Sequence, residues 1–186
     1  MEFSTKSVIF TDCDGVLLDF DKGFKKWFRV NYPEKQFRDF DCRESTVMEY
    51  VETLEADHLD PIWSSIDAVR EMHYDHGVNF IVISAIENYA TKARWQNLKK
   101  FYGSSVKELH CIGGKLSKSH LLEHHKNEGF LWIEDHVGNA ELGKNLGFDS
   151  VLIKHDSNSS YSGEIPVLND MTEIKNYWLE KISLHH

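Results

Sequence analysis

Short apolar segments alternate with amphipathic segments along most of the chain. Five of the apolar segments are rich in β-branched residues and predict strands at 7–11, 79–84, 106–112, 130–134 and 150–154. Three of these segments are nearly continuous apolar runs, which is typical of strands buried on both faces of a sheet. The segments between and after them predict helices at 88–102, 117–126, 137–146 and 171–182.

Capping residues mark the ends of several predicted helices. Asp170 is the predicted N-cap of the last helix, with Glu173 three residues later. Glycines follow helical stretches at the positions where a C-terminal cap is expected: Gly77, Gly103, Gly129 and Gly147. Strands that alternate with helices through short links predict an α/β fold with a mainly parallel sheet and right-handed crossovers.

Residues 20–60 interrupt this alternation, because they contain no convincing strand pattern. Two aromatic-rich helical patches, GFKKWFRVNY and STVMEYVETLEADHL, are joined there by a polar stretch. Pro61 is the predicted first residue of a helix that leads into the second strand. We therefore predict a core made of residues 1–19 and 61–186, with a small helical cap, residues 20–60, inserted after the first strand.

The composition is that of a globular protein with an acidic balance. The chain has 186 residues, 41% of them hydrophobic and 27% charged, and its net charge is −9 at pH 7. Nucleic acid is therefore not an expected partner. The three cysteines form no CxxC pair, which argues against a disulfide framework or a zinc site. The N-terminus lacks a signal-peptide pattern and no apolar run is long enough to span a membrane, so we expect a cytoplasmic protein without a membrane partner.

Two aspartates, Asp12 and Asp14, come directly after the first predicted strand and are followed by Gly15. Two carboxylates so close together repel each other unless a cation or a proton is shared between them. Oxygen ligands suit Mg²⁺, and an aspartate can attack phosphorus while a second carboxylate transfers the proton. The alternative is that these residues are turn acids that cap a helix.

Three further strand ends carry polar side chains that would suit the same chemistry. Ser84 ends the second strand, and Glu134 and Asp135 follow the fourth. Lys115 and Lys118 lie where the chain leaves the third strand. Each serine or lysine is unremarkable alone, but ligands bind beyond the carboxyl ends of parallel strands, where all of these residues meet. Together they predict a site for Mg²⁺ and a phosphoryl group.

These motifs, in this order, resemble those of the haloacid dehalogenase-like (HAD) phosphohydrolases. The resemblance covers most of the chain, and its most specific part is DCDGVLLD at residues 12–19. It implies a Rossmann-like three-layer core with a C1-type cap, and Mg²⁺ as cofactor. It also implies that Asp12 is the nucleophile and a Mg²⁺ ligand. Asp14 would be the general acid and base and would bind the metal through its backbone carbonyl.

The remaining family roles follow the later motifs. The resemblance assigns phosphate binding to Ser84 and Ala85, and assigns the neutralisation of the aspartyl-phosphate to one of two lysines, Lys115 or Lys118. Asp135 would bind Mg²⁺ directly and Glu134 through water. This fourth motif is Glu-Asp where Asp-Asp is common in the family, and Asn139 stands where a further acid often follows.

We expect Lys118 to be the catalytic lysine. It follows Ser117, a predicted N-cap, and would lie in the first turn of a helix that holds its amine in one place. Lys115 follows two glycines in what should be a turn, and we expect it at most to contribute to phosphate binding.

The predicted function is a Mg²⁺-dependent phosphomonoesterase that acts on a small phosphate ester through an aspartyl-phosphate. The segment DGVLLDF is similar to the DGVLADF opening of 5′(3′)-deoxyribonucleotidases, which makes Phe20 a candidate to stack on a nucleobase and a nucleoside monophosphate the first substrate candidate. The alternatives are a sugar-phosphate phosphatase, a phosphomutase-like enzyme and a non-catalytic binding module of the same fold. The sequence leaves the oligomeric state open.

Overall fold

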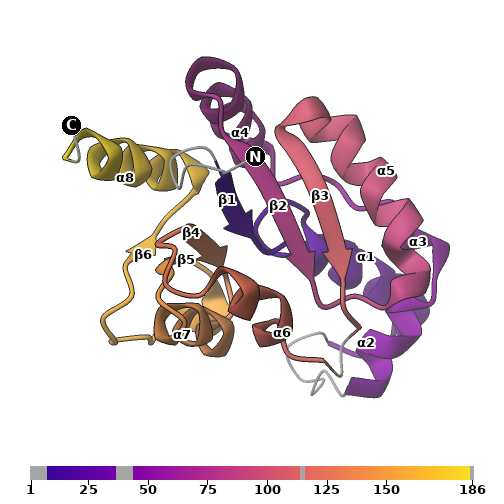
Figure 1. Ribbon diagram of the computed structural model, residues 1–186. Helices are drawn as coiled ribbons and strands as arrows, with labels where there is room; N and C mark the ends of the chain where they lie inside the picture. The colour runs from indigo at the N-terminus through magenta and orange to yellow at the C-terminus, as the bar shows by residue number, and fades with distance from the viewer. Residues whose placement is uncertain (1–7, 37–43, 114–115, 185–186) are drawn as a thin grey trace.

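The structure is a computed structural model that describes residues 8–36, 44–113 and 116–184. At its centre is a six-stranded sheet with the strand order β3-β2-β1-β4-β5-β6 (Figure 1). Every pair of neighbouring strands runs parallel. The strands are β1 (Val8–Thr11), β2 (Asn79–Ser84), β3 (Val106–Cys111), β4 (Leu131–Glu134), β5 (Asp149–Ile153) and β6 (Val167–Leu168).

Helices cover both faces of the sheet, because the strand side chains alternate between two hydrophobic clusters. Ile9 of β1 belongs to the larger cluster, and its neighbour Phe10 belongs to the second. The larger cluster includes side chains of α4 (Trp63–His76), α5 (Thr91–Tyr102) and α8 (Met171–Ser183). The second includes side chains of α6 (Ser119–Leu122) and α7 (Val137–Asn145). The result is a three-layer α/β arrangement, as predicted.

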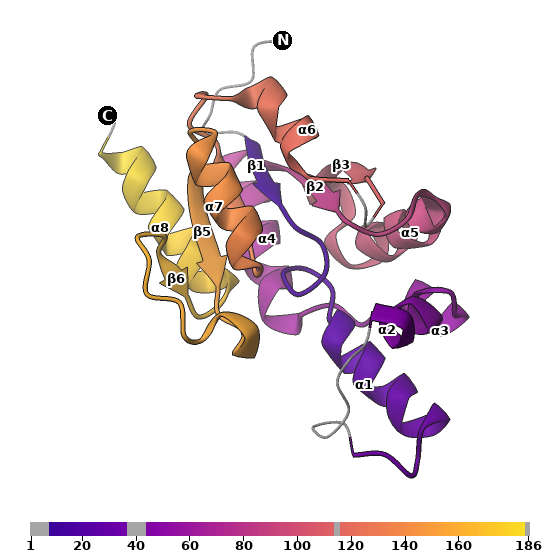
Figure 2. The same cartoon turned by 90° about the horizontal axis from the view of Figure 1, so that it is seen from below.

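Within the described part of the chain between β1 and α4 lie three helices: α1 (Phe20–Asn31), α2 (Glu44–Val51) and α3 (Leu54–Asp57). We call them the inserted helices; Figure 2 shows them grouped together beyond the sheet. Asp19 begins α1 as its N-cap by accepting a hydrogen bond from the backbone N–H of Lys22. Aromatic side chains of α1 and α2, among them Phe24, Phe28 and Tyr50, are buried in the larger cluster. Most of the aromatic residues that the structure describes in the insertion therefore pack into this cluster.

Most predicted elements are found within one or two residues of their expected ends. Asp170 caps α8 as predicted, accepting hydrogen bonds from the backbone N–H groups of Thr172 and Glu173. Gly77 ends α4 in the left-handed conformation, also as predicted. Strand β6, only two residues long, was not predicted, because so short a segment carries no periodicity.

Two predicted helix starts are wrong. Helix α4 begins at Trp63 rather than at Pro61, because Pro61 forms a β-bridge with Leu18 instead. The helix predicted at 117–126 is a single short turn, α6, followed by a 3₁₀ turn, and Lys118 rather than Ser117 is its N-cap residue. No helix within the described residues is long and apolar enough to cross a membrane.

Candidate active site

The candidate site lies where β2, β1 and β4 end side by side. The chain leaves β1, continues on one side of it through β2 and β3, and returns to its other side as β4. Open parallel sheets bind ligands at such a switch in strand order, beyond the carboxyl ends of the strands. Asp12 follows β1 directly, Ser84 ends β2 and Glu134 ends β4. The sheet therefore brings these predicted site residues together.

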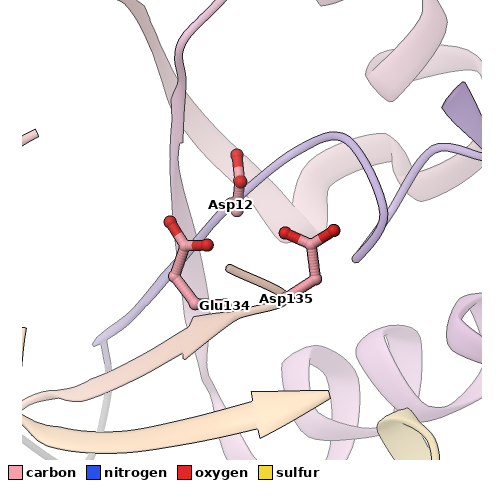
Figure 3. Close-up of side chains that lie close together, drawn as sticks. All are labelled: Asp12, Glu134 and Asp135. Atoms are coloured by element: carbon pink, nitrogen blue, oxygen red, sulfur yellow. The ribbon is translucent and has the colours of Figure 1, made fainter. Parts of the chain in front are cut away.

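Three carboxylates converge at this switch point. Asp12, Glu134 and Asp135 each offer an oxygen, and these oxygens lie within 4.8 Å of one another. Figure 3 shows Glu134 and Asp135 extending from the end of β4 toward Asp12. One carboxylate oxygen of Asp12 accepts a hydrogen bond of 2.6 Å from the backbone N–H of Cys13. This cluster provides the hard oxygen ligands that Mg²⁺ prefers.

Lys118 brings a buried positive charge to the cluster. Its amine lies 2.8 Å from Oδ2 of Asp12 and 2.6 Å from Oε1 of Glu134. The lysine side chain is 2% exposed and that of Glu134 is fully buried. Burial acts to lower the pKa of Lys118, but the two carboxylates outweigh it and the pKa lies above its ordinary value. Lys118 is therefore a fixed cation in contact with Asp12.

The single positive charge of Lys118 does not balance the three carboxylates, and two of these carboxyl groups have pKa values above their ordinary range. Burial and the charge of Asp12 raise the pKa of Glu134 to about 8, although Lys118 opposes the shift. Burial and the same charge raise the pKa of Asp135 to about 6. Without a metal the cluster therefore favours bound protons. A divalent cation is the other means of stabilising it in its ionised form.

Gly15 allows Asp135 to approach the loop after β1. A Cβ atom at Gly15 would lie 2.2 Å from Oδ2 of Asp135, well inside van der Waals contact. Gly15 also has φ +79°, a backbone conformation that favours glycine. The glycine that follows the two aspartates in the sequence is thus needed both for the turn and for the space that Asp135 occupies.

Asp14 lies on the other side of this loop, beside β2. The Ser84 hydroxyl is 3.5 Å from Oδ2 of Asp14, and Nη2 of Arg94 is 3.4 Å from its Oδ1. The Asp14 side chain is 25% exposed, whereas that of Arg94 is 1% exposed. Burial raises the pKa of Asp14 above its ordinary value, and Arg94 opposes that shift. Asp14 is thus accessible to a ligand while being held near two polar groups.

Two further predicted site residues line a cavity next to Asp14. The cavity has a volume of about 250 Å³ and separates the inserted helices from the segment after β2. Phe20, the first residue of α1, and Ala85, the residue after β2, both line it. Its remaining lining residues are Val47, Met48, Val51, Ile86 and Glu87. Lys115, the alternative lysine, lies outside the described residues.

Two polar residues at the site were not singled out from the sequence. One is Arg94 in α5; its only distinguishing sequence signal would have been a charge on the buried face of an otherwise amphipathic helix. The other is Asn158, which is buried and donates 2.8 Å hydrogen bonds to the backbone carbonyls of Asp135 and Ile153. These two hydrogen bonds hold the end of β5 next to the backbone of Asp135. Asn158 stands in a polar loop sequence, where nothing distinguishes it from its neighbours.

No protein-family model matches the sequence, and no curated protein matches it either. Solved structures do match. A HAD family hydrolase from Deinococcus radiodurans R1 with bound phosphate and sodium has a TM-score of 0.61 at 17% identity, covering 96% of this chain and 97% of that one. L-2-haloacid dehalogenase from Xanthobacter autotrophicus has a TM-score of 0.62 at 12% identity, covering 91% and 97%.

A third match, CbbY from Rhodobacter sphaeroides in complex with phosphate, has a TM-score of 0.61 at 11% identity and covers 90% of this chain and 96% of that one. The chain has the haloacid dehalogenase-like fold. The Rossmann-like α/β fold predicted from the sequence is therefore confirmed. At these low identities the similarity to HAD proteins shows the fold alone. Any activity has to be inferred from the residues of this chain.

Proposed function

We propose that this protein is a Mg²⁺-dependent phosphomonoesterase that acts through an aspartyl-phosphate at Asp12. The observation that carries the proposal is the arrangement around Asp12. Its carboxylate lies 2.8 Å from the buried amine of Lys118 and in one group with Glu134 and Asp135. A nucleophile, a fixed cation and a set of oxygen ligands are the parts that phosphoryl transfer requires.

The donor set fits Mg²⁺. Asp12 and Asp135 would bind it directly, Asp14 through its backbone carbonyl, and Glu134 through water. Glu134 is less suited to direct binding, because its two oxygens already accept hydrogen bonds from Lys118 and from the backbone N–H of His136. When bound, Mg²⁺ would neutralise part of the charge on the carboxylates and on the phosphoryl oxygens.

In the first half of the proposed reaction, a carboxylate oxygen of Asp12 attacks phosphorus and the bond from phosphorus to the ester oxygen breaks. The leaving oxygen takes a proton from Asp14, which becomes a carboxylate. In the second half, that carboxylate takes a proton from water as the water oxygen attacks phosphorus. The bond from phosphorus to Asp12 breaks, inorganic phosphate leaves, and Asp12 and protonated Asp14 are restored. Lys118 stabilises the negative charge at Asp12 throughout.

The inserted helices serve as the cap in this proposal and select the leaving group. The cavity beside Asp14 presents Phe20 and several apolar side chains, which suits an apolar, flat group better than a sugar rich in hydroxyls. This favours a nucleoside monophosphate over a sugar phosphate as substrate. Stacking on an aromatic side chain contributes about 1–3 kcal/mol per base, or roughly 5–150-fold in kcat/KM.

A panel of phosphate esters assayed with and without Mg²⁺ tests the activity. We expect hydrolysis only with Mg²⁺, abolished in Asp12→Asn and reduced at least ~10²-fold in Asp14→Asn. Phe20→Ala should lower kcat/KM for nucleotides and leave that for simple sugar phosphates nearly unchanged. Equal kcat/KM values for the two classes in the wild-type protein would favour a sugar-phosphate phosphatase or a phosphomutase-like enzyme. No turnover of any ester, with phosphate esters still bound, would favour the non-catalytic binding module.

A further inference from the structure

Arg94 is a charged residue on the buried face of an amphipathic helix. It is one of the buried residues of α5, together with Asn97, Leu98 and Tyr102, and its side chain is 1% exposed. None of its three guanidinium nitrogens donates a hydrogen bond to a residue that the structure describes. Its one ionic contact among those residues is to Asp14, where Nη2 lies 3.4 Å from Oδ1. Because a guanidinium is not deprotonated in proteins, Arg94 brings a permanent positive charge to Asp14.

Packing alone does not explain a charge at position 94. Removing a guanidinium from water is costly, and close hydrogen bonds normally offset that cost. The contact of 3.4 Å is longer than the ~2.7–2.9 Å of a charge-assisted hydrogen bond. An apolar side chain of similar length would fill the same space without the cost of burying a charge. The arginine is therefore better explained by its effect on Asp14 than by its contribution to the core.

The carboxyl group of Asp14 faces both Arg94 and the cavity of about 250 Å³ beside β2. The Asp14 side chain is 25% exposed and lines this cavity, whereas Arg94 is not among the described residues that line it. Oδ1 of Asp14 is near Arg94, and Oδ2 is 3.5 Å from the hydroxyl of Ser84. Since the two contacts involve different oxygens, together they restrict rotation of the carboxyl group. They set the orientation from which Asp14 meets a ligand in the cavity.

Helix α5 is itself tied to the loop that carries Asp14. The Tyr102 hydroxyl donates a 2.6 Å hydrogen bond to the carbonyl of Leu17, three residues after Asp14. The side-chain amide of Asn97 donates a 2.9 Å hydrogen bond to the carbonyl of Leu59, where the chain returns from the inserted helices. Both donors are buried in the same helix as the guanidinium. These hydrogen bonds therefore fix the point from which the guanidinium reaches the carboxyl group.

We propose that Arg94 is a positioning residue for phosphoryl transfer, whose guanidinium holds the carboxyl group of Asp14 in the orientation that delivers a proton to the leaving oxygen. This inference rests on the proposed phosphatase function and extends it to a residue that no sequence motif marks. Arg94 touches neither the phosphoryl group nor the leaving group in this proposal. Its removal should therefore affect only the step in which Asp14 transfers the proton.

Phosphate esters that differ in the basicity of their leaving oxygen test this role. 4-Nitrophenyl, phenyl and benzyl phosphate are similar in shape, but their leaving oxygens are increasingly basic and depend increasingly on a proton donor. The ratio kcat/KM covers the steps up to cleavage of the ester bond, so the later release of phosphate from Asp12 does not affect it. Arg94→Met should lower kcat/KM for benzyl phosphate roughly 10–100-fold and leave that for 4-nitrophenyl phosphate nearly unchanged.

Further variants separate positioning from a general loss of structure. Asp14→Asn should show the same dependence on the leaving group, and adding Arg94→Met to it should cause little further loss, because both changes act on one step. Arg70→Met is the control, because Arg70 is an exposed arginine that donates a hydrogen bond to the carbonyl of Phe101; its kcat/KM values should match the wild type. Arg94→Gln, uncharged but polar, serves in the same comparison if Arg94→Met does not fold. Equal losses for all three esters, or losses that add fully to those of Asp14→Asn, would overturn the proposal.

A structural comparison separates this proposal from the proposed activity. Crystal structures of the wild type and of Arg94→Met, both with Mg²⁺, do not depend on turnover. In the variant the carboxyl group of Asp14 should turn out of its wild-type orientation and lose its contact with Ser84. If no ester is hydrolysed but Asp14 turns in this way, the phosphatase proposal fails and the positioning of Asp14 by Arg94 stands. The same Asp14 orientation in both structures refutes the positioning role.

Discussion

The amine of Lys118 lies 2.8 Å from Oδ2 of Asp12, across the gap between the turn of α6 and the end of β1. The side chains of both residues are largely buried, at 2% and 12% exposure. A buried cation in contact with a buried carboxylate supplies a counter-charge at the atom that would attack phosphorus. The same contact makes Lys118 important for stability, because the two acids near it would otherwise be buried without a counter-charge.

Lys118→Met should therefore change activity and stability together. We expect kcat to fall by about 10²–10³-fold, as for the loss of one group that stabilises transition-state charge. The metal-free variant should also unfold more easily at pH 8 than the wild type, since Asp12 and Glu134 lose their partner. Steady-state kinetics and chemical denaturation measure the two effects. Lys144→Met is the control, because Lys144 lies in the last turn of α7 and pairs with Glu164 at the surface. A wild-type kcat in Lys118→Met would refute the role assigned to Lys118.

Gly15 should tolerate no side chain without a loss of metal binding. Gly15→Ala would place a Cβ 2.2 Å from Oδ2 of Asp135 and force that carboxylate to move. Gly77→Ala is the matched control, because Gly77 has nearly the same φ, +72°, but nothing within 4 Å of an added Cβ. Both variants should lose roughly 1 kcal/mol of stability from backbone strain.

Only Gly15→Ala should weaken the binding of Mg²⁺, measured by calorimetry or by the rise in melting temperature on adding MgCl₂. If the two alanine variants bound Mg²⁺ equally well, Asp135 would not be the ligand proposed here.

Asn158 should act on the metal through the backbone of Asp135. Asn158→Ala removes the two hydrogen bonds that tie Asp135 and Ile153 together. Residues that orient metal ligands typically contribute about 10–100-fold to affinity, and we expect a loss of that size in the Kd for Mg²⁺. Asn145→Ala, at an exposed position on α7, provides the control. Unchanged affinity in Asn158→Ala would mean that the loop plays no part in positioning Asp135.

The stabilising effect of Mg²⁺ should increase with pH. In the metal-free folded protein, Glu134 has a pKa of about 8 and Asp135 of about 6, both above the ~4 of an unfolded chain. Between pH ~4 and ~8 the folded state therefore binds more protons than the unfolded state, so these two groups make unfolding easier as the pH rises.

Mg²⁺ competes with those protons, so it should raise the melting temperature more at pH 8 than at pH 5. Thermal unfolding at both pH values, with MgCl₂ and with EDTA, measures the difference. A rise that is equal at the two pH values would show that Mg²⁺ does not bind at Glu134 and Asp135.

The sequence predicted the parts of the fold and site that local patterns determine. Strand β2 was predicted at its observed bounds, because a buried strand reads as a continuous apolar run. The aspartates after β1 and the acids after β4 were expected to meet because strand ends in parallel sheets mark ligand sites, and Asp12 does lie beside Glu134 and Asp135. Their roles in catalysis and metal binding stay predictions. Lys118 was preferred over Lys115 because a helix capped by Ser117 was expected to hold it. The structure has Lys118 itself as the N-cap residue, and its amine contacts Asp12.

Arg94 and Asn158 could not be found in this way, because their importance depends on distant partners. Arg94 meets Asp14 from a different helix, and Asn158 reaches the backbone of Asp135 from the loop after β5. Neither contact produces a periodic pattern or a local motif in the sequence from which it could be predicted. The start of α4 was misplaced for the same reason: the bridge from Leu18 to Pro61 joins two segments far apart in the chain.

The most direct test of the account is to look for phosphate on Asp12 during turnover. The protein would be mixed with Mg²⁺ and its best substrate from the ester panel, quenched in acid within one turnover, digested and examined by mass spectrometry. The account predicts a phosphorylated peptide with the modification on Asp12, absent without Mg²⁺ and absent in Asp12→Asn. Turnover without any phosphorylated peptide, together with an active Asp12→Asn variant, would contradict it.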